Sequence, residues 1–196
     1  MTTAGELLAA LRKKHAADAV VREVVIDDPI EHAIRRRVSI DNQRHYGEHQ
    51  AALMEAYYRN RGDEIADSIP DGWTMSASVP QRRIDALILA STGITAVEIK
   101  VSRADFKRDT EDKRRAWIAV ANRFVYLVPK GLVTPDEVAP KCGLWEFDPD
   151  ATGPFSYQHG ISAKKKATVN KEPAPLPFQV TRALAYRVSN HEKDAA

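Results

Sequence analysis

Three residues with catalytic potential lie close together in the middle of the chain. Asp85 stands just inside a short apolar run, and a second apolar run carries Glu98 and Lys100 with Ile99 between them. Side chains alternate along a strand, so Glu98 and Lys100 project from one face. Such a set of charges is unusual in a hydrophobic core. It suits a divalent metal ion held beside a hydrolytic water.

The elements that must position these residues can be predicted from local patterns. The two apolar runs are separated by Ser91-Thr92-Gly93 and predict a β-hairpin over residues 83–101. Ser102 is a suitable N-cap for a helix over residues 103–121. The nearly continuous apolar run over residues 123–129 then predicts a buried strand.

Elements before the hairpin are less sharply defined. Apolar spacing predicts helices over residues 4–16 and 42–60, and a strand is expected over residues 73–79. The segment over residues 19–26 is compatible with either a strand or a helix, and Pro29 interrupts the element before it.

Beyond residue 129 the signals are shorter. Residues 134–137 (TPDE) have the composition of a helix start, and residues 143–147 and 155–159 are expected to form a pair of strands. Lys and Pro dominate residues 164–177, which predicts an extended arm before a helix over residues 177–191.

The expected order from residue 42 to 128 is helix, strand, strand, strand, helix, strand. This order predicts an α/β fold with a mixed central sheet. We therefore expect a core over residues 42–163 and a basic, Pro-rich arm with a C-terminal helix over residues 164–196. Residues 1–41 form an N-terminal extension to which the sequence assigns no role.

Composition restricts the class of protein. The chain has 196 residues and a net charge of +2, so it is not a polycation, although its basic residues are clustered. The single cysteine, Cys142, excludes a disulfide framework and a cysteine-rich zinc site, and the six histidines show no metal-ligand spacing. No apolar run approaches the length of a membrane span, so a soluble, cytoplasmic protein is expected.

Phosphodiester hydrolysis is the chemistry that these residues suit best. Mg²⁺ or Mn²⁺ prefers oxygen ligands, which Asp85, Glu98 and the main-chain carbonyl of Ile99 offer. Lys100 is placed to orient or deprotonate the water and to balance the charge of the intermediate. A third carboxylate is expected from the preceding helix, with Glu48 preferred over Glu55.

DNA is the expected partner of such a site. Candidate phosphate contacts are the basic residues before the hairpin and on the following helix: Arg82, Arg83, Lys107, Arg108, Lys113 and Arg114. The helix residues would show the same pattern in sequence if they formed only a solvated face.

Asp85 followed by Glu98-Ile99-Lys100 resembles the PD-(D/E)XK motif of the restriction-endonuclease-like nucleases, with Ile84 in place of the motif's proline. The segments EIKVSRADFKRD (98–109) and NRFVYLVPKGLV (122–133) are similar to the MmcB-like DNA repair proteins and their phage relatives. The resemblance covers about residues 43–192. It implies an αβββαβ core, a divalent metal, DNA as substrate, and Asp85, Glu98 and Lys100 as the catalytic residues.

Other readings of the same residues stay open. Glu98 and Lys100 could form a satisfied ion pair on a half-exposed strand. The protein could be a DNA-binding module that does not cleave, or the nuclease subunit of a larger DNA-processing complex. The chain has no P-loop, so an ATP-driven motor would have to be another protein.

Overall fold

The structure is a computed structural model that describes residues 2–151 and 159–194. The chain divides into two compact units, one formed by Met1–Val25 with Arg83–Ala196 and the other by Ile26–Arg82. The smaller unit is therefore an insertion within the larger one, and the boundary expected at residue 41 does not match this division. No helix in the described part of the chain is long and apolar enough to span a membrane.

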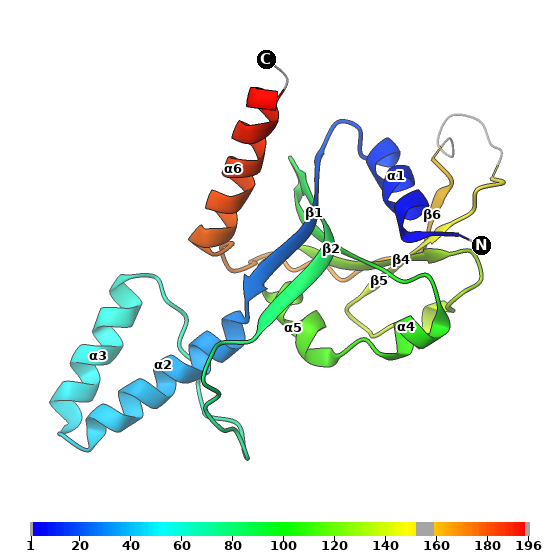
Figure 1. The fold of residues 1–196 in the computed structure, drawn as a ribbon. Coiled ribbons are helices and arrows are strands. Elements are labelled where there is room, and N and C mark those ends of the chain that lie inside the picture. The colour runs from blue at the N-terminus through cyan, green and yellow to red at the C-terminus, as the bar shows by residue number, and fades with distance from the viewer. Residues whose placement is uncertain (1, 152–158, 195–196) are drawn as a thin grey trace. The chain divides into compact units, whose positions relative to one another are not determined.

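A six-stranded mixed sheet in the order β1-β2-β3-β4-β5-β6 forms the centre of the fold (Figure 1). Its strands are β1 (Ala19–Asp27), β2 (Gln81–Ala90), β3 (Gly93–Ile99), β4 (Arg123–Pro129), β5 (Gly143–Phe147) and β6 (Ile161–Lys165). β2 and β3 are antiparallel, β3, β4 and β5 are parallel, and β6 runs antiparallel to β5. The predicted α/β class, the hairpin and the strand over residues 123–129 are confirmed, and the ambiguous residues 19–26 form a strand.

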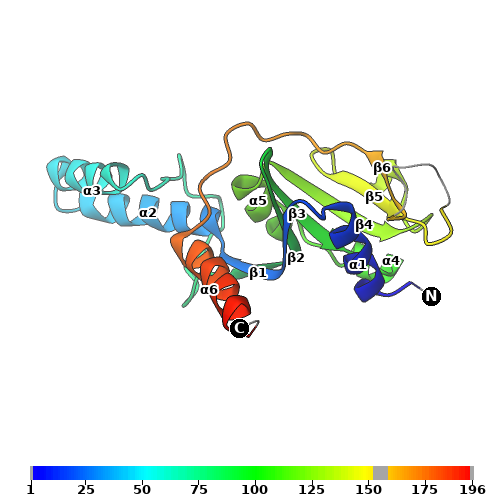
Figure 2. The same ribbon diagram turned by 90° about the horizontal axis from the view of Figure 1, so that it is seen from above.

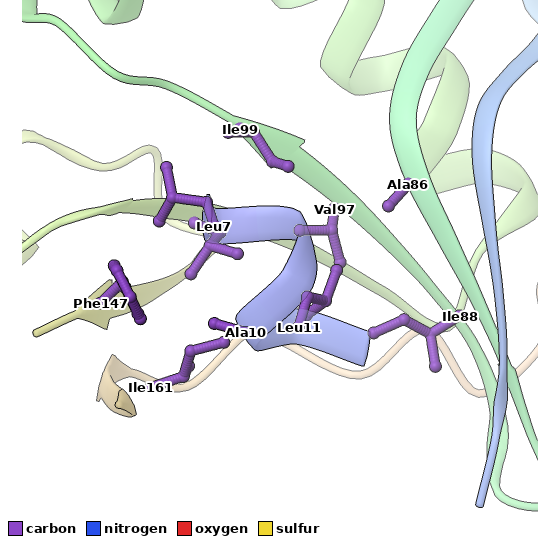
Figure 3. Packing of buried hydrophobic residues seen from close by; sticks show 10 residues of the cluster. Leu7, Ala10, Leu11, Ala86, Ile88, Val97, Ile99, Phe147 and Ile161 are labelled. Carbon is purple, nitrogen blue, oxygen red and sulfur yellow. The ribbon is translucent and has the colours of Figure 1, made fainter. Parts of the chain in front are cut away.

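Helix α1 (Ala4–Lys14) packs on one face of this sheet. The Thr3 hydroxyl accepts from the main-chain N–H of Glu6, whose carboxylate accepts from the N–H of Thr3, so a capping box fixes the helix start. Leu7 and Leu11 are fully buried in a cluster with residues such as Val97 and Ile99 of β3 (Figure 3). The first 25 residues are thus part of the core, not an extension.

The opposite face of the sheet is covered by α4 (Arg103–Lys107) and α5 (Glu111–Val120), as Figure 1 shows. The single helix expected over residues 103–121 is therefore wrong. Thr110 interrupts it, because its hydroxyl accepts from the N–H of Lys113 at 3.4 Å and starts a new helix. Phe106 and Tyr126 pack edge to face, which fixes α4 against β4.

Outside the insertion the chain order is helix, strand, strand, strand, two helices, strand, which is close to the expected order but has a different beginning. Its first helix is α1 and its first strand is β1, whereas residues 42–60 belong to the insertion. The strand expected over residues 73–79 does not form.

The inserted unit contains α2 (Pro29–Arg44) and α3 (Glu48–Asn60). Asp28 caps α2 by accepting from the N–H groups of Ile30 and Glu31, with Pro29 in the first turn. Gly47, with φ of 119°, separates the two helices. The helix expected over residues 42–60 therefore spans the end of one helix and the whole of the next.

The C-terminal part is more structured than an extended arm. It begins with β6, and the strap that follows donates main-chain hydrogen bonds from Asn170 to Asn122 and from Ala174 to Ala119. The strap crosses from β6 to α6 (Phe178–Asp194), as seen from above in Figure 2, and α6 confirms the predicted terminal helix. Residues 135–137 form only a short 3-10 turn, and most of the strand expected over residues 155–159 lies outside the described residues.

Candidate active site

Asp85 and Glu98 meet at the end of the β2–β3 hairpin. The Oδ2 atom of Asp85 accepts a hydrogen bond from the main-chain N–H of Ile99 at 2.8 Å, which holds the carboxylate beside the neighbouring strand. Glu98 stands in register with Tyr126 of β4, and its side chain is only 3% exposed. The alternative of an ion pair on a half-exposed strand is therefore wrong about the exposure of the strand, whereas the ion pair between Glu98 and Lys100 is present.

The two oxygens of the Glu98 carboxylate differ in their surroundings. Oε1 lies 2.9 Å from the Lys100 ammonium and 2.5 Å from the Lys113 ammonium. Oε2 is buried and has no hydrogen-bond partner among the residues that the structure describes. Burial raises the pKa of Glu98, the negative charge of Asp85 raises it further, and the two lysines only partly oppose this. An additional cation near Oε2 and Asp85 would relieve this cost.

Lys100 is enclosed by carboxylates. Besides Glu98, its Nζ atom lies 3.7 Å from Asp105 and 3.6 Å from Asp109, and its side chain is 8% exposed. Burial alone would lower the pKa of Lys100, but the hydrogen bond to Glu98 and the charges of Asp109 and Asp105 outweigh burial and raise it. The ammonium therefore stays protonated at neutral pH, which supports charge balancing and not proton abstraction.

Asp109 links this cluster to α5 and β4. Its side chain is 2% exposed, and its Oδ2 atom accepts from the Tyr126 hydroxyl at 2.5 Å and from Arg114 at 2.9 Å. Burial and the Asp109 carboxylate both raise the pKa of Tyr126, which keeps the hydroxyl a donor. Arg114 was predicted to contact DNA; in the structure its guanidinium pairs with the buried Asp109 carboxylate. Its contact with DNA stays a prediction.

Asp85, Glu98 and Lys100 line one cleft of about 590 Å³, formed by residues of the larger unit. Arg83, predicted to contact DNA, is exposed and also lines it. Lys107 and Arg108 are exposed on and just after α4, which leaves them accessible to a polyanion.

The cleft also contains residues that sequence reasoning did not single out. Arg22 and Glu23 of β1 line it, although the first 41 residues had no assigned role. Glu23 has a φ of 49°, unusual for a residue other than glycine, and the Arg187 guanidinium donates to the carbonyls of Arg22 and Glu23. No local sequence pattern indicates such a backbone, because the irregularity is fixed by a helix more than 150 residues later in the chain.

Three other predicted residues lie in the inserted unit. Glu48 is on α3, 84% exposed, and 3.5 Å from Arg44. The alternative, Glu55, pairs with Arg59 on the same helix. Arg82 donates to the buried carboxylate of Asp28 at 3.0 Å, so it contributes to the structure of the insertion. A role for Glu48 as third carboxylate stays a prediction.

The oxygen ligands of this cleft suit a hard divalent cation that is only partly coordinated by the protein. Within the described ranges no group of three or more His, Cys, Asp or Glu side chains is arranged to hold a metal ion. Asp85, Glu98 and Ile99 line the cleft, and Mg²⁺ commonly completes a set of two carboxylates and a carbonyl with water and substrate phosphate. This fit is supported by the buried Oε2 atom of Glu98, which has no hydrogen-bond partner in residues 2–151 and 159–194.

Comparison with known proteins does not indicate a function for this chain, so the function is inferred from the geometry of the cleft. No family model matches the chain, and no curated protein is similar to it at a significant level. Among solved structures, the SPO1766 protein of unknown function from Silicibacter pomeroyi is similar over 58% of this chain and 73% of its own. Its sequence identity is 21% and its TM-score 0.42, values that carry no argument about function.

Proposed function

We propose that this chain is a metal-dependent nuclease that hydrolyses phosphodiester bonds in DNA. The observation that carries the proposal is a buried carboxylate oxygen of Glu98 without a hydrogen-bond partner among the described residues, in a side chain that lines one cleft with Asp85 and Lys100. Two acidic side chains brought together in a cleft without full compensation raise the free energy of the folded protein, which is typical of a site built to bind a cation.

In this proposal Asp85, Glu98 and the Ile99 carbonyl would hold Mg²⁺ or Mn²⁺. Such an ion lowers the pKa of a bound water and neutralises charge that develops on the phosphoryl oxygens. Lys100, protonated and fixed by three carboxylates, donates toward the attacking water and the phosphoryl group. Its positive charge stabilises the transition state, in the way that preorganised donors do in other hydrolases.

DNA as the substrate is supported by charge beside the cleft. Arg22 and Arg83 line it, and Lys107 and Arg108 are exposed nearby on the same unit. Basic side chains at the rim of an acidic, metal-dependent site can neutralise the phosphates that flank the scissile bond. The resemblance of residues 85–109 to nuclease motifs favours the same substrate.

A non-cleaving DNA-binding module is the second candidate. It is favoured by one observation: two ammonium groups, those of Lys100 and Lys113, already supply counter-charge to the Glu98 carboxylate. A role as one subunit of a larger DNA-processing complex is compatible with either candidate, since the partner would deliver DNA to this cleft.

Cleavage assays with the purified full chain separate these candidates. Supercoiled, single-stranded and branched DNA are each incubated with Mn²⁺, Mg²⁺ or EDTA, and Glu98→Gln and Asp85→Asn are assayed in parallel. Metal-dependent cleavage that both variants lose supports the proposed nuclease. Binding to DNA without cleavage on every substrate indicates the non-cleaving module, and equal cleavage by wild type and both variants excludes this cleft as the active site.

A further inference from the structure

Two lysines contact the same oxygen of Glu98, and the second one is not needed to explain the proposed reaction. Lys113 extends from α5 and places its Nζ atom 2.5 Å from Oε1, closer than Lys100 at 2.9 Å. Two ammonium groups on one oxygen repel each other, while Oε2 of the same carboxylate has no hydrogen-bond partner in the described part of the chain. Charge balance at Oε1 therefore does not require both lysines.

The two lysines are held very differently. Lys100 is also within 4 Å of Asp105 and Asp109, and its side chain is 8% exposed. Among the described residues the only ion-pair partner of Lys113 is Glu98, and its side chain is 23% exposed at the wall of the cleft. Lys100 is fixed in place, whereas Lys113 can move away by breaking a single ion pair.

A divalent cation bound to Glu98 would lie within a few ångströms of the Lys113 ammonium. Like charges at that distance repel strongly inside a protein, so the metal ion and Lys113 compete for the same carboxylate. The lysine side chain is a flexible four-carbon stem, and the open cleft leaves it room to move. Once displaced, its ammonium stays in the space where a substrate phosphate would bind.

We propose that Lys113 is an exchangeable counter-ion of this site. It neutralises Glu98 when no divalent cation is bound, and after the cation takes Glu98 it contacts a non-bridging phosphate oxygen of the substrate. The inference rests on the proposed function and adds to it a residue that couples metal binding to substrate binding. It also explains why a buried carboxylate stays tolerable in the protein without metal.

The test is Mn²⁺ affinity, measured by isothermal titration without DNA at constant ionic strength. Lys113→Met should bind Mn²⁺ at least about tenfold more tightly than wild type, because an adjacent charge changes such equilibria by an order of magnitude or more. Lys141→Met is the matched control, since Lys141 is exposed and does not line the cleft, and its affinity should equal that of wild type. Lys113→Arg keeps the charge and should bind no more tightly than wild type.

The same variants are then assayed for cleavage. Lys113→Met should reach half-maximal rate at a lower Mn²⁺ concentration than wild type, but with a maximal rate about 100-fold lower, as expected when one donor to the transition state is removed. Unchanged or weaker Mn²⁺ binding by Lys113→Met overturns the role of Lys113 and leaves the nuclease proposal standing. Equal Mn²⁺ binding by wild type and an Asp85→Asn, Glu98→Gln variant overturns the metal site itself.

Discussion

Replacement of Lys100 by methionine is the most informative single change at this site. It removes the ammonium but keeps an unbranched side chain of similar length. The removed charge lies 2.9 Å from Glu98 and 3.6 Å from Asp109, and the Lys100 and Glu98 side chains are 8% and 3% exposed. Breaking a buried ion pair from one side costs about 3–5 kcal/mol.

The structure places the expected cost at the lower end of that range. Lys113 still neutralises Glu98 after the substitution, and Arg114 still neutralises Asp109. We therefore expect a loss of about 3 kcal/mol in the free energy of unfolding. In a chain of this size about 1 kcal/mol corresponds to about 2–4 °C, so Tm should fall by about 6–12 °C.

The pH dependence of this loss follows from the raised pKa of Lys100. A lysine with a raised folded-state pKa gives stability that is fully present below its ordinary pKa of 10.5 and is lost as the pH rises through the folded-state value. The difference in Tm between wild type and Lys100→Met should therefore be constant across neutral pH and shrink only in strongly alkaline buffer. Circular dichroism melting curves over a pH series measure it.

Cleavage is measured below the Tm of the variant, under single turnover and at saturating Mn²⁺. Loss of one preorganised donor should reduce the rate about 100- to 1,000-fold. DNA affinity, measured by anisotropy in EDTA, should change little because Lys100 is buried among carboxylates and not presented to solvent. A variant that cuts at the wild-type rate would refute the mechanism, and an unchanged Tm would refute the buried ion-pair network. Lys141→Met should alter none of these quantities.

Three further predictions concern docking, electrostatics and the hairpin. The double substitution Lys107→Ala, Arg108→Ala should flatten the slope of log affinity against log salt by about 0.9 for each phosphate that is no longer neutralised, and an unchanged slope in anisotropy titrations would make these residues a solvated face. The raised pKa of Glu98 adds stability below its ordinary pKa of 4.5 that is lost as pH rises through the folded-state value, so the Tm of wild type relative to that of Glu98→Gln should fall across that window. Gly93→Ala should reduce the free energy of unfolding by more than about 1 kcal/mol in calorimetry, because Gly93 has a φ of 122° and a new Cβ would collide with the Asn122 side chain; a neutral effect would contradict the turn geometry.

The hairpin and its charged residues could be predicted because the signals are local. Alternation along two short runs sets which side chains share a face, and a two-residue turn fixes how the runs pair. Ala86 lies opposite Val97, as an antiparallel hairpin closed at Ser91-Thr92 requires. The meeting of Asp85 with Glu98 and Lys100 in one cleft follows from that register.

The first half of the core could not be assigned in the same way. Residues 42–60 have a convincing helical pattern, but that pattern is the same for a helix of an insertion and for a helix packed on the sheet. Which helix joins the sheet depends on contacts between distant parts of the chain. The capping signals were nevertheless present: Asp28-Pro29 marks the start of α2, and Thr110 marks the start of α5.

The roles of the basic residues also depended on distant partners. Lys107, Lys113 and Arg114 belong to adjacent basic clusters in sequence, yet the structure leaves the first exposed, directs the second to Glu98 and pairs the third with Asp109. A charge run carries no information about which members face a buried carboxylate. The three residues acquire different roles only through the packing of α4 and α5 on the sheet.

The difference between the two lysines at Glu98 has a simple electrostatic origin. Lys100 serves three carboxylates, so moving it would leave Asp105 and Asp109 without their nearby ammonium as well as weakening Glu98. Within the described residues Lys113 forms an ion pair with Glu98 alone, and a cation bound at Glu98 would replace its charge there. The same side-chain chemistry therefore produces a fixed charge on the β3 side and an exchangeable one on the α5 side. Which lysine is fixed and which is exchangeable depends on how many carboxylates lie within 4 Å of each ammonium. Neither the spacing of the residues in sequence nor their type determines that number.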